Sequence, residues 1–449
     1  MTIFIKPAIP QSEDVFKLST IDQIMPRKHM AFLFCFELAE SDKLNAIKQL
    51  QSGLESALAD MPQFAGEMQL ADNKRNELQL FLGPDSAVFF EENHTWSGKS
   101  FTELKAAHFP ISLLPEDELL SEAAKTDNGL QVMMIKATFI PGGLILAVQV
   151  HHSFTDAKGA EMFLKAWSKH ASAHFQCRKL DVEPLDEEAL ERWRLSYGSK
   201  KVKAEDFPEF KDALYQVSGT KSEVVPSLWS MSKEKLEELQ VFVSSPTPVS
   251  KTEALAAFLA CHLYRARFGS DTDSNRQIND ITLYAASDLR SRIEPPLAPS
   301  FIGNASMIVP VLTTLDQLIN VSGPSLNSIA SQIHEAVAKY DTTAVKKRIS
   351  FYNGQPSIGA KRPNLNYYPG PNTLITDTSE ICYYSLDWGG SLGQIDCFRT
   401  VGMSASTGNC SVYPKLRDGS IEIFLRHEKE VVDALAISED FSRFVKPVS

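Results

Sequence analysis

Two histidines and an aspartate stand where an apolar segment gives way to a helix-like one. Residues 144–150 read Leu-Ile-Leu-Ala-Val-Gln-Val, and His151, His152 and, after three more residues, Asp156 follow them. A neutral imidazole is the usual general base for a hydroxyl or amine nucleophile near pH 7. Strand ends that open into turns are places from which such groups reach a cleft. His152 is therefore a candidate base and Asp156 a candidate supporting residue.

A purely structural interpretation of these residues stays open. His152 can be a core histidine with satisfied hydrogen bonds, and Asp156 can simply cap the following helix. A pattern as short as HxxxD is common by chance, so taken alone it favours the structural interpretation. Zinc binding has less support, because adjacent strand residues point to opposite faces and no third ligand is evident. We expect no metal site.

A glycine-rich segment near the C-terminus is the second candidate. Residues 384–393 read Tyr-Ser-Leu-Asp-Trp-Gly-Gly-Ser-Leu-Gly, and this turn is expected to follow a strand. Glycines at such density can suggest a phosphate loop. No Lys-Ser or Lys-Thr pair follows Gly393 and no helix clearly begins there, so a P-loop is not predicted.

The segments around His152 predict a hairpin followed by a helix. Residues 132–139 and 144–150 are rich in strand formers and are separated by Ile-Pro-Gly-Gly, which is typical of a β-hairpin. Residues 157–173 carry apolar side chains at helical spacing. The hairpin would place His152 at its end, and the helix would begin directly after Asp156.

The second half of the chain contains one strongly marked helix start. Ser250-Lys251-Thr252-Glu253 is a capping box, which pairs a cap serine with a glutamate three residues later. We expect it to open a helix that runs to about residue 267. Another helix is expected over 326–340, with Ser325 as its cap. The basic residues 346–348 that follow it are expected in a flexible segment.

Strand-like and helix-like segments alternate along the whole chain, which indicates an α/β or α+β protein. Residues 178–223 are charged and broken by prolines and glycines, so they read as a long connection with helical pieces around 187–194. We therefore predict an N-terminal domain over 1–180, a linker over 181–223 and a C-terminal domain over 224–449.

Composition excludes several classes of protein. The chain has 449 residues, 43% of them hydrophobic, and a net charge of −11, so a general attraction to nucleic acid or anionic membrane is not expected. No two of the six cysteines form a CxxC pair, which leaves a zinc or redox motif without support. No secretory signal or apolar run of membrane-spanning length is present. A cytoplasmic monomer is the expectation.

The two candidate segments together resemble a known pair of motifs. HHSFTDA and SLDWGGSLG are similar to the HxxxD and DFGWG signatures of the BAHD acyltransferases, closest to the fungal branch that includes trichothecene acetyltransferases. Further stretches fall in the family's order: Leu-Ser-Thr-Ile-Asp at 18–22, Met-Pro-Gln-Phe-Ala-Gly at 61–66, and Asp-Leu-Arg-Ser-Arg at 288–292 with Pro-Pro at 295–296 and Gly-Asn-Ala at 303–305. The resemblance spans about residue 18 to the end.

The resemblance implies a fold and a reaction. The fold would be α/β, with two chloramphenicol-acetyltransferase-like domains of mixed sheets flanked by helices, joined by a long crossover and separated by a channel. Acyl-CoA would enter as co-substrate from one face, and a small-molecule acceptor from the other, with no tightly bound cofactor. His152 would act as general base for transfer of an acyl group, expected to be acetyl, to a hydroxyl or amine of a secondary metabolite, without a covalent intermediate.

The resemblance also implies roles for further residues. Asp156 would pair with Arg290, or alternatively with Arg292, rather than act on substrate. Asp387 and Gly389 would shape the channel wall. The residues implied to contact CoA or lie near its thioester are Ser250, Lys251, Thr252 and Thr376.

Three departures from the family's pattern leave alternatives open. Ala157 replaces the glycine that usually follows HxxxD, the DFGWG motif is altered at residues 388, 390 and 391, and Thr378 stands where a tryptophan is common. A homologue that cyclises or isomerises a metabolite without acylating it is one alternative. A catalytically silent scaffold is the other, and measurable CoA affinity would separate either from an acyltransferase.

Overall fold

A mixed six-stranded sheet carries His152 at the end of one of its central strands. The computed structural model describes residues 1–122, 129–198, 202–212, 222–269, 280–366, 370–402 and 408–448. In spatial order the strands of this sheet are β1 (Thr2–Ile5), β6 (Val88–Asn93), β8 (Met133–Ile140), β9 (Gly143–His151), β3 (His29–Glu37) and β16 (Cys397–Gly402). The β6–β8 pair is parallel and the other pairs are antiparallel.

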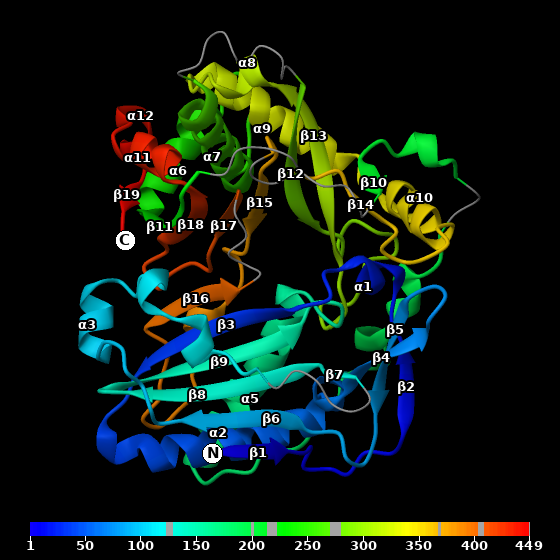
Figure 1. Cartoon of the computed structure of the whole chain (residues 1–449), viewed down its shortest axis with the longest axis vertical. Coiled ribbons are helices and arrows are strands. Elements are labelled where there is room, and N and C mark those ends of the chain that lie inside the picture. The colour runs from blue at the N-terminus through cyan, green and yellow to red at the C-terminus, as the bar shows by residue number, and fades with distance from the viewer. Residues whose placement is uncertain are drawn as a thin grey trace.

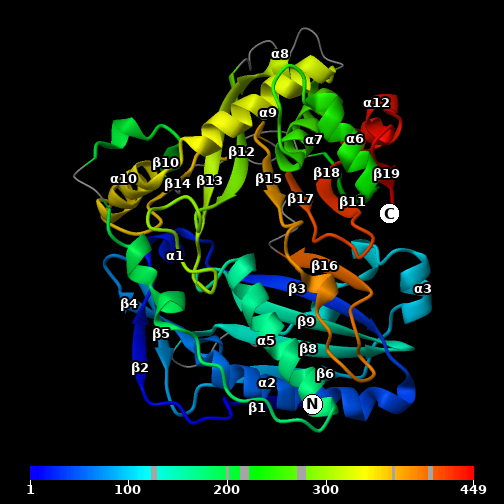
Figure 2. The same ribbon diagram turned by 180° about the vertical axis from the view of Figure 1, so that it is seen from behind.

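Both faces of this sheet are covered, which explains the unbroken apolar run at 144–150. Helices α2 (Lys43–Asp60) and α5 (Ala157–Phe175) pack on one face, and α3 (Phe101–Ala106) with its following loops covers the other (Figures 1 and 2). Leu144 and Leu146 contribute to the first core, whereas Ile145 and Ala147 contribute to the second. A strand buried on both sides loses the alternation of apolar and polar residues.

The predicted hairpin and helix around His152 are confirmed. β8 and β9 pair in register around a turn in which Gly142 adopts a positive φ of 78°. That backbone conformation is accessible to glycine at little cost. α5 then begins at Ala157, with Asp156 as its cap.

A small four-stranded sheet lies beside the large one, at the right of Figure 1. Its order is β2 (Asp14–Lys17), β5 (Glu77–Leu82), β4 (Glu67–Asp72) and β7 (Leu130–Gln131). The short helix α1 (Thr20–Ile24) follows β2 directly and leads into β3. Asp22, at the third position of α1, completes a capping box with Ser19.

The second half of the chain builds a seven-stranded mixed sheet. Its order is β13 (Ser306–Thr314), β12 (Asp280–Asp288), β15 (Leu374–Asp377), β17 (Asn409–Val412), β18 (Ile421–Glu428), β11 (Val224–Met231) and β19 (Lys446–Pro447). Its helices, which share one apolar core with the sheet, are α6 (Lys233–Val243), α7 (Lys251–Phe268), α9 (Gly323–Ala338) and α11 (Lys429–Ala436), with the short α8 (Leu315–Leu318) and α12 (Glu439–Ser442) beside them (Figure 2). The predicted capping box of α7 is present.

The connection between the two large sheets is built from short turns. Among the described residues of 181–223, 3-10 helices span Glu187–Leu190, Arg192–Leu195 and Ala204–Asp206, so the helical pieces expected around 187–194 are confirmed. The strand β10 (Phe210–Asp212) pairs with β14 (Lys361–Pro363) from the second half.

One strand crosses back between the halves. β16 lies in the C-terminal half of the sequence but pairs with β3 in the six-stranded sheet. The segment before it, including Tyr383, Trp388 and Ile395, packs in the core of the same sheet. The domain boundaries at 180 and 224 stay a prediction.

Two expectations for the second half are wrong. Helix α9 begins at Gly323 and is capped by Ser322 through the N–H of Ser325, so Ser325 lies inside the helix and is not its cap. The basic residues 346–348 lie in the helix α10 (Thr342–Asn353), not in a flexible segment. Asp341 caps α10, and buried apolar residues at helical spacing, among them Val345 and Ile349, hold it in place.

Candidate active site

His151 is the last residue of strand β9 and His152 the first residue after it, and the two have very different surroundings. His151 is fully buried, and its Nδ1 accepts a hydrogen bond of 3.2 Å from the N–H of Ser153. Its ring meets that of His29 edge to face, with centroids 5.2 Å apart. Burial lowers the pKa of His151 to about 3, so its imidazole is neutral at neutral pH. His151 therefore has a structural role in this turn.

His152 is only partly buried and has one nitrogen shielded from solvent. Its main-chain N–H donates to the carbonyl of Lys28 at 2.9 Å, which joins the turn to the segment before β3. Burial lowers the pKa of His152, and the nearby backbone of His152 itself and of Thr155 opposes this only partly. Nδ1 is buried and has no hydrogen-bond partner among the residues that the structure describes. A neutral imidazole in this position can accept a proton at Nε2.

Asp156 is directed into a buried ion pair. Its carboxylate accepts two hydrogen bonds from Arg290, Nη1 to Oδ2 at 3.0 Å and Nη2 to Oδ1 at 2.9 Å. It also accepts from the N–H groups of Ala305 at 2.9 Å and Gly159 at 3.0 Å. Burial alone would raise the pKa of Asp156, but Arg290 and these N–H groups hold that pKa below its usual value. With four donors on it, this carboxylate is a structural anion.

Of the two candidate arginines, Arg290 is the partner of Asp156. Arg290 is buried and also donates to the carbonyls of Phe301 and Gly303, each at 3.1 Å. Arg292 is exposed, and its Nη1 donates to the carbonyl of Val337 at 3.4 Å. The ion pair thus joins the start of α5 to the 301–305 loop of the second half.

A buried network that the sequence analysis missed supports the main chain of His152. The Nδ2 of Asn304 donates to the carbonyl oxygen of His152 at 2.8 Å and to Oδ1 of Asp22 at 2.9 Å. The N–H of Asn304 donates to the same Oδ1, also at 2.9 Å. Asp22 and Asn304 both lie in motifs of the family resemblance, but the motifs alone gave no role for either residue.

The crossover contributes the third member of this network, Arg192. Its Nη1 donates to Oδ2 of Asp22 at 2.7 Å and to the carbonyl of Phe154 at 2.9 Å. Its guanidinium also lies 4.8 Å from the centre of the Phe154 ring. Arg192, Asp22 and Asn304 are all buried, so three distant segments meet around residues 152–156. No sequence motif marked Arg192, because its partners are distant along the chain.

The Asp387–Gly389 segment lies at the other end of α5. Gly389 has a φ of 72°, and a Cβ on it would stand 2.6 Å from the main chain of Ser172. Ser172 is 15 residues beyond Ala157 in α5, which corresponds to about 22 Å along the helix. Asp387, itself exposed, accepts from the N–H of Gly389 at 2.9 Å and so closes the turn. The motif is a packing corner against α5.

Trp388, which stands at the second position of this altered motif, packs in the core. Trp388 is fully buried, with its ring edge-on to Trp167 of α5 at 5.1 Å between centroids and to Phe36 of β3 at 5.8 Å. Its carbonyl and that of Gly389 accept hydrogen bonds from Nε2 of Gln49 in α2. The altered residue is therefore built into the core by its ring and its main chain, although its buried Nε1 has no hydrogen-bond partner among the described residues.

The four residues implied for CoA lie in the second half. Ser250 caps α7 through the N–H of Glu253, and the Nζ of Lys251 lies 3.1 Å from Oε1 of Glu237. Thr252 is exposed, and Thr376 lies half-buried in β15. No hydrogen bond or ion pair joins these residues to His152 within the described ranges, so their role stays a prediction.

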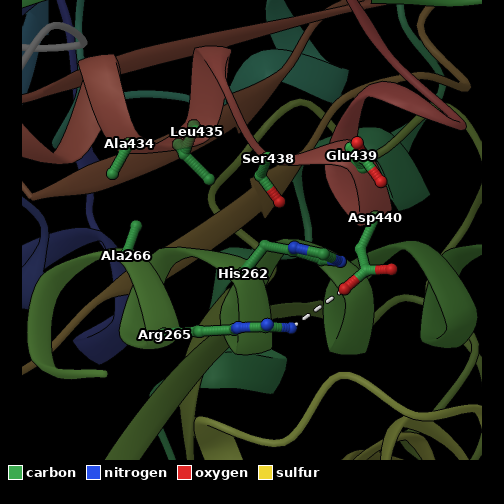
Figure 3. A pocket seen from close by; sticks show the side chains of 8 residues that line it. All are labelled: His262, Arg265, Ala266, Ala434, Leu435, Ser438, Glu439 and Asp440. Atoms are coloured by element: carbon green, nitrogen blue, oxygen red, sulfur yellow. Dashed lines mark hydrogen bonds and ion pairs between the residues drawn. The ribbon is translucent and has the colours of Figure 1, made fainter. Parts of the chain in front are cut away.

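Two of the cavities in the described part of the chain lie away from His152. One, of about 440 Å³, lies between α7, α11 and α12 and is lined by His262, Arg265 and Asp440 (Figure 3). The other, of about 460 Å³, lies between β2 and the crossover. His152 lines neither of them, and the channel implied for the active site stays a prediction.

Neither a metal site nor a membrane-spanning helix is found in the described part of the chain. In the described part of the chain, no group of three or more histidine, cysteine, aspartate or glutamate side chains is arranged to hold a metal ion. Among the described helices, none has the length and apolar character needed to cross a membrane.

Comparison with known proteins assigns the family. A family model described as the transferase family matches residues 1–436, and the chain belongs to this family, that of the BAHD acyltransferases. Acyltransferase easC of Emericella nidulans is 29% identical, with 98% of this chain and 97% of that protein covered. Eremophilane O-acetyltransferase prx11 of Penicillium rubens is 26% identical, with 95% and 98% covered.

The fold of the chain is similar to that of a protein of known structure, TRI101. The structure of Fusarium graminearum TRI101 complexed with ethyl coenzyme A has a TM-score of 0.83 at 16% identity, and the match covers 97% of this chain and 100% of TRI101. This likeness confirms the predicted α/β class with mixed sheets flanked by helices. Family membership and relatives named as acyltransferases confirm the predicted enzyme class, an acyl-CoA-dependent acyltransferase.

Proposed function

We propose that this enzyme transfers an acyl group, acetyl in the first instance, from acyl-CoA to a hydroxyl or amine of a small secondary metabolite. His152 is the general base, and no covalent enzyme intermediate forms. The observation that carries this proposal is the separation of roles at the turn. The carboxylate of Asp156 already accepts hydrogen bonds from Arg290 and from two main-chain N–H groups. The neutral imidazole of His152 is therefore the group at this turn that is able to take a proton.

The chemistry follows from that arrangement. Nε2 of His152 takes the proton of the acceptor as the acceptor oxygen or nitrogen attacks the thioester carbonyl carbon. The tetrahedral intermediate collapses, the carbon–sulfur bond breaks, and the CoA thiolate recovers the proton from His152. A general base contributes roughly 10²–10⁴ in rate, so orientation of the two substrates must supply much of the rest.

The held main chain of His152 suits a base of this kind. Asn304 fixes the carbonyl of His152, and Lys28 fixes its N–H, so the backbone that carries the imidazole is held from both sides. A base held in one orientation keeps its Nε2 aimed at the acceptor, and misplacement by about 1 Å can cost 10²-fold in rate. Arg192 and Asp22 support Asn304 from behind.

The names of related proteins favour a hydroxyl acceptor. One curated relative is an eremophilane O-acetyltransferase, and TRI101 has been solved with coenzyme A and T-2 mycotoxin. We propose that the nucleotide part of CoA lies near the start of α7, where Ser250, Lys251 and Thr252 stand, and that Thr376 lies closer to the thioester. A helix N-terminus presents free N–H groups and the positive end of its dipole to phosphate.

The altered glycine-rich motif does not favour a non-acylating reaction. Its tryptophan and glycines pack against α5 at the end remote from His152. The HxxxD turn itself is complete, because Asp156 and Arg290 are paired.

The proposal is tested by incubating the enzyme with a panel of acyl-CoAs and candidate metabolites. Release of free thiol and a matching mass increase of the acceptor are the expected results. Thiol release that does not depend on an acceptor would indicate hydrolysis, and acceptor conversion without CoA would indicate a non-acylating enzyme. A monomeric state and a cytoplasmic location stay predictions, the first open to light scattering of the purified protein.

A further inference from the structure

The cavity between β2 and the crossover has the size and lining of a small-molecule site. Its volume of about 460 Å³ falls within the range of roughly 300–1,000 Å³ usual for such sites. His152 is not among its lining residues. Its lining includes Phe16, Lys17, Arg192, Trp193, Tyr197 and Ile358.

Two large aromatic side chains stand exposed at this cavity. Trp193 is 56% exposed and Tyr197 is 68% exposed, although both have large apolar surfaces. Their ring centroids are 6.4 Å apart on the crossover, and Val15 on β2, also lining the cavity, is 49% exposed. Grouped exposed apolar residues on a soluble protein mark interaction sites more often than isolated ones do.

The uncompensated charge of the cavity is positive. Among its charged residues, Glu77 is paired with Arg75 at 2.6 Å and Arg192 with Asp22 at 2.7 Å. Lys17 makes no ion pair or side-chain hydrogen bond with any residue that the structure describes. The buried Nη2 of Arg192 likewise has no acceptor among the described residues. Because Nη2 is shielded from solvent, the donor that an anionic group in the cavity would meet is the ammonium of Lys17.

We propose that this cavity binds a small apolar molecule that carries one carboxylate. The carboxylate lies against Lys17, on the side of Arg192, and the apolar body lies between Trp193, Tyr197 and Phe16. Binding is non-covalent and is separate from the acyl-transfer site. Because Arg192 also holds Asp22 and Phe154, a ligand here lies beside a residue that supports the His152 turn.

Two fluorescent probes that differ only in charge test the proposal on the full-length enzyme. Anilinonaphthalene sulfonate has an apolar aromatic body with one anionic group, and phenylnaphthylamine has the same rings without the charge. Lys17→Gln should raise the Kd of the sulfonate about fivefold and leave that of phenylnaphthylamine nearly unchanged. Trp193→Ala should weaken both probes. Naphthaleneacetate should displace the sulfonate, whereas naphthaleneacetamide should not.

Matched variants locate the probe. Lys74→Gln removes an exposed lysine that does not line the cavity, and Arg265→Gln removes the arginine of the cavity in Figure 3; neither should change the Kd of the sulfonate. Saturating CoA should also leave it unchanged. The proposal is overturned if Lys17→Gln has no effect on the sulfonate, or if Arg265→Gln or CoA weakens its binding. Circular dichroism of each variant confirms that the fold is retained.

Discussion

Asn304 donates a hydrogen bond of 2.8 Å to the main-chain carbonyl of His152, across 152 residues of sequence. The same carboxamide donates to Asp22, which Arg192 of the crossover also holds. The proposed base is therefore fixed by three segments that are far apart in the chain, and its position depends on how the two halves meet.

His152→Ala should retain the fold and lose at least about two orders of magnitude in kcat, which is the scale of a general base. The measurement is free-thiol release from acetyl-CoA with saturating acceptor. His151→Ala serves as the comparison: it should lower the thermal midpoint, because a fully buried ring is lost, and reduce kcat far less. Wild-type turnover by His152→Ala would exclude His152 as the base.

Asp156→Asn should destabilise the enzyme by about 3–5 kcal/mol, because it leaves the buried Arg290 without its anionic partner. Asp288→Asn is the matched control. Asp288 accepts from the same arginine at 3.2 Å, but its side chain is 55% exposed, so the expected cost is below about 1 kcal/mol. Denaturant unfolding gives both values, and equal losses would show that burial of the pair does not matter.

Asn304→Ala should lower kcat about tenfold with little change in either KM, because the main chain of His152 loses a fixed donor while the binding surfaces stay. Asn372→Ala removes another buried carboxamide, whose Nδ2 donates to the carbonyl of Thr282 in β12. It should cost similar stability, about 1–3 kcal/mol, and leave kcat unchanged. A parallel fall in kcat for both variants would mean that the effect is one of general destabilisation.

The acid limb of the pH dependence of kcat/KM should lie below pH 6.5. Burial lowers the pKa of His152 from that ordinary value, and the enzyme loses activity only when the imidazole is protonated, so activity falls as pH falls through the lowered pKa. Asp156 raises the pKa of His152, so any soluble Asp156→Asn enzyme should show its acid limb at still lower pH. A limb above 6.5 would contradict a buried neutral base.

Lys251→Glu should raise the apparent KM for acyl-CoA and leave that for the acceptor nearly unchanged. The effect should shrink at high salt, because a partly exposed charge is screened within about 10 Å at 0.1 M ionic strength. Lys233→Glu is the matched control, since Lys233 is also the first residue of a serine-capped helix. If both variants change the KM for acyl-CoA alike, or neither does, the CoA nucleotide lies elsewhere.

Patterns among neighbouring residues predicted the helices and strands that position the site. Contacts between residues far apart in the sequence could not be predicted in this way. The β8–β9 hairpin, the start of α5 at Asp156 and the capping box of α7 depend on neighbouring residues, and each is confirmed. Helix α10 was not predicted, because its run of basic residues was interpreted as a flexible segment although its apolar residues have helical spacing. The contact of Arg192 with Asp22 and the pairing of β16 with β3 could not be predicted, because each joins residues more than 150 positions apart.

Because β16 pairs with β3 in the six-stranded sheet, one edge of this sheet can be completed only late in the synthesis of the chain. A ribosome releases β3 and β9 long before β16, and until residue 402 has emerged, β3 remains an open edge of a sheet whose residues are almost all apolar. Open apolar edges are the surfaces on which unfinished chains join one another. The N-terminal half cut at the crossover would keep this edge of β3 permanently open.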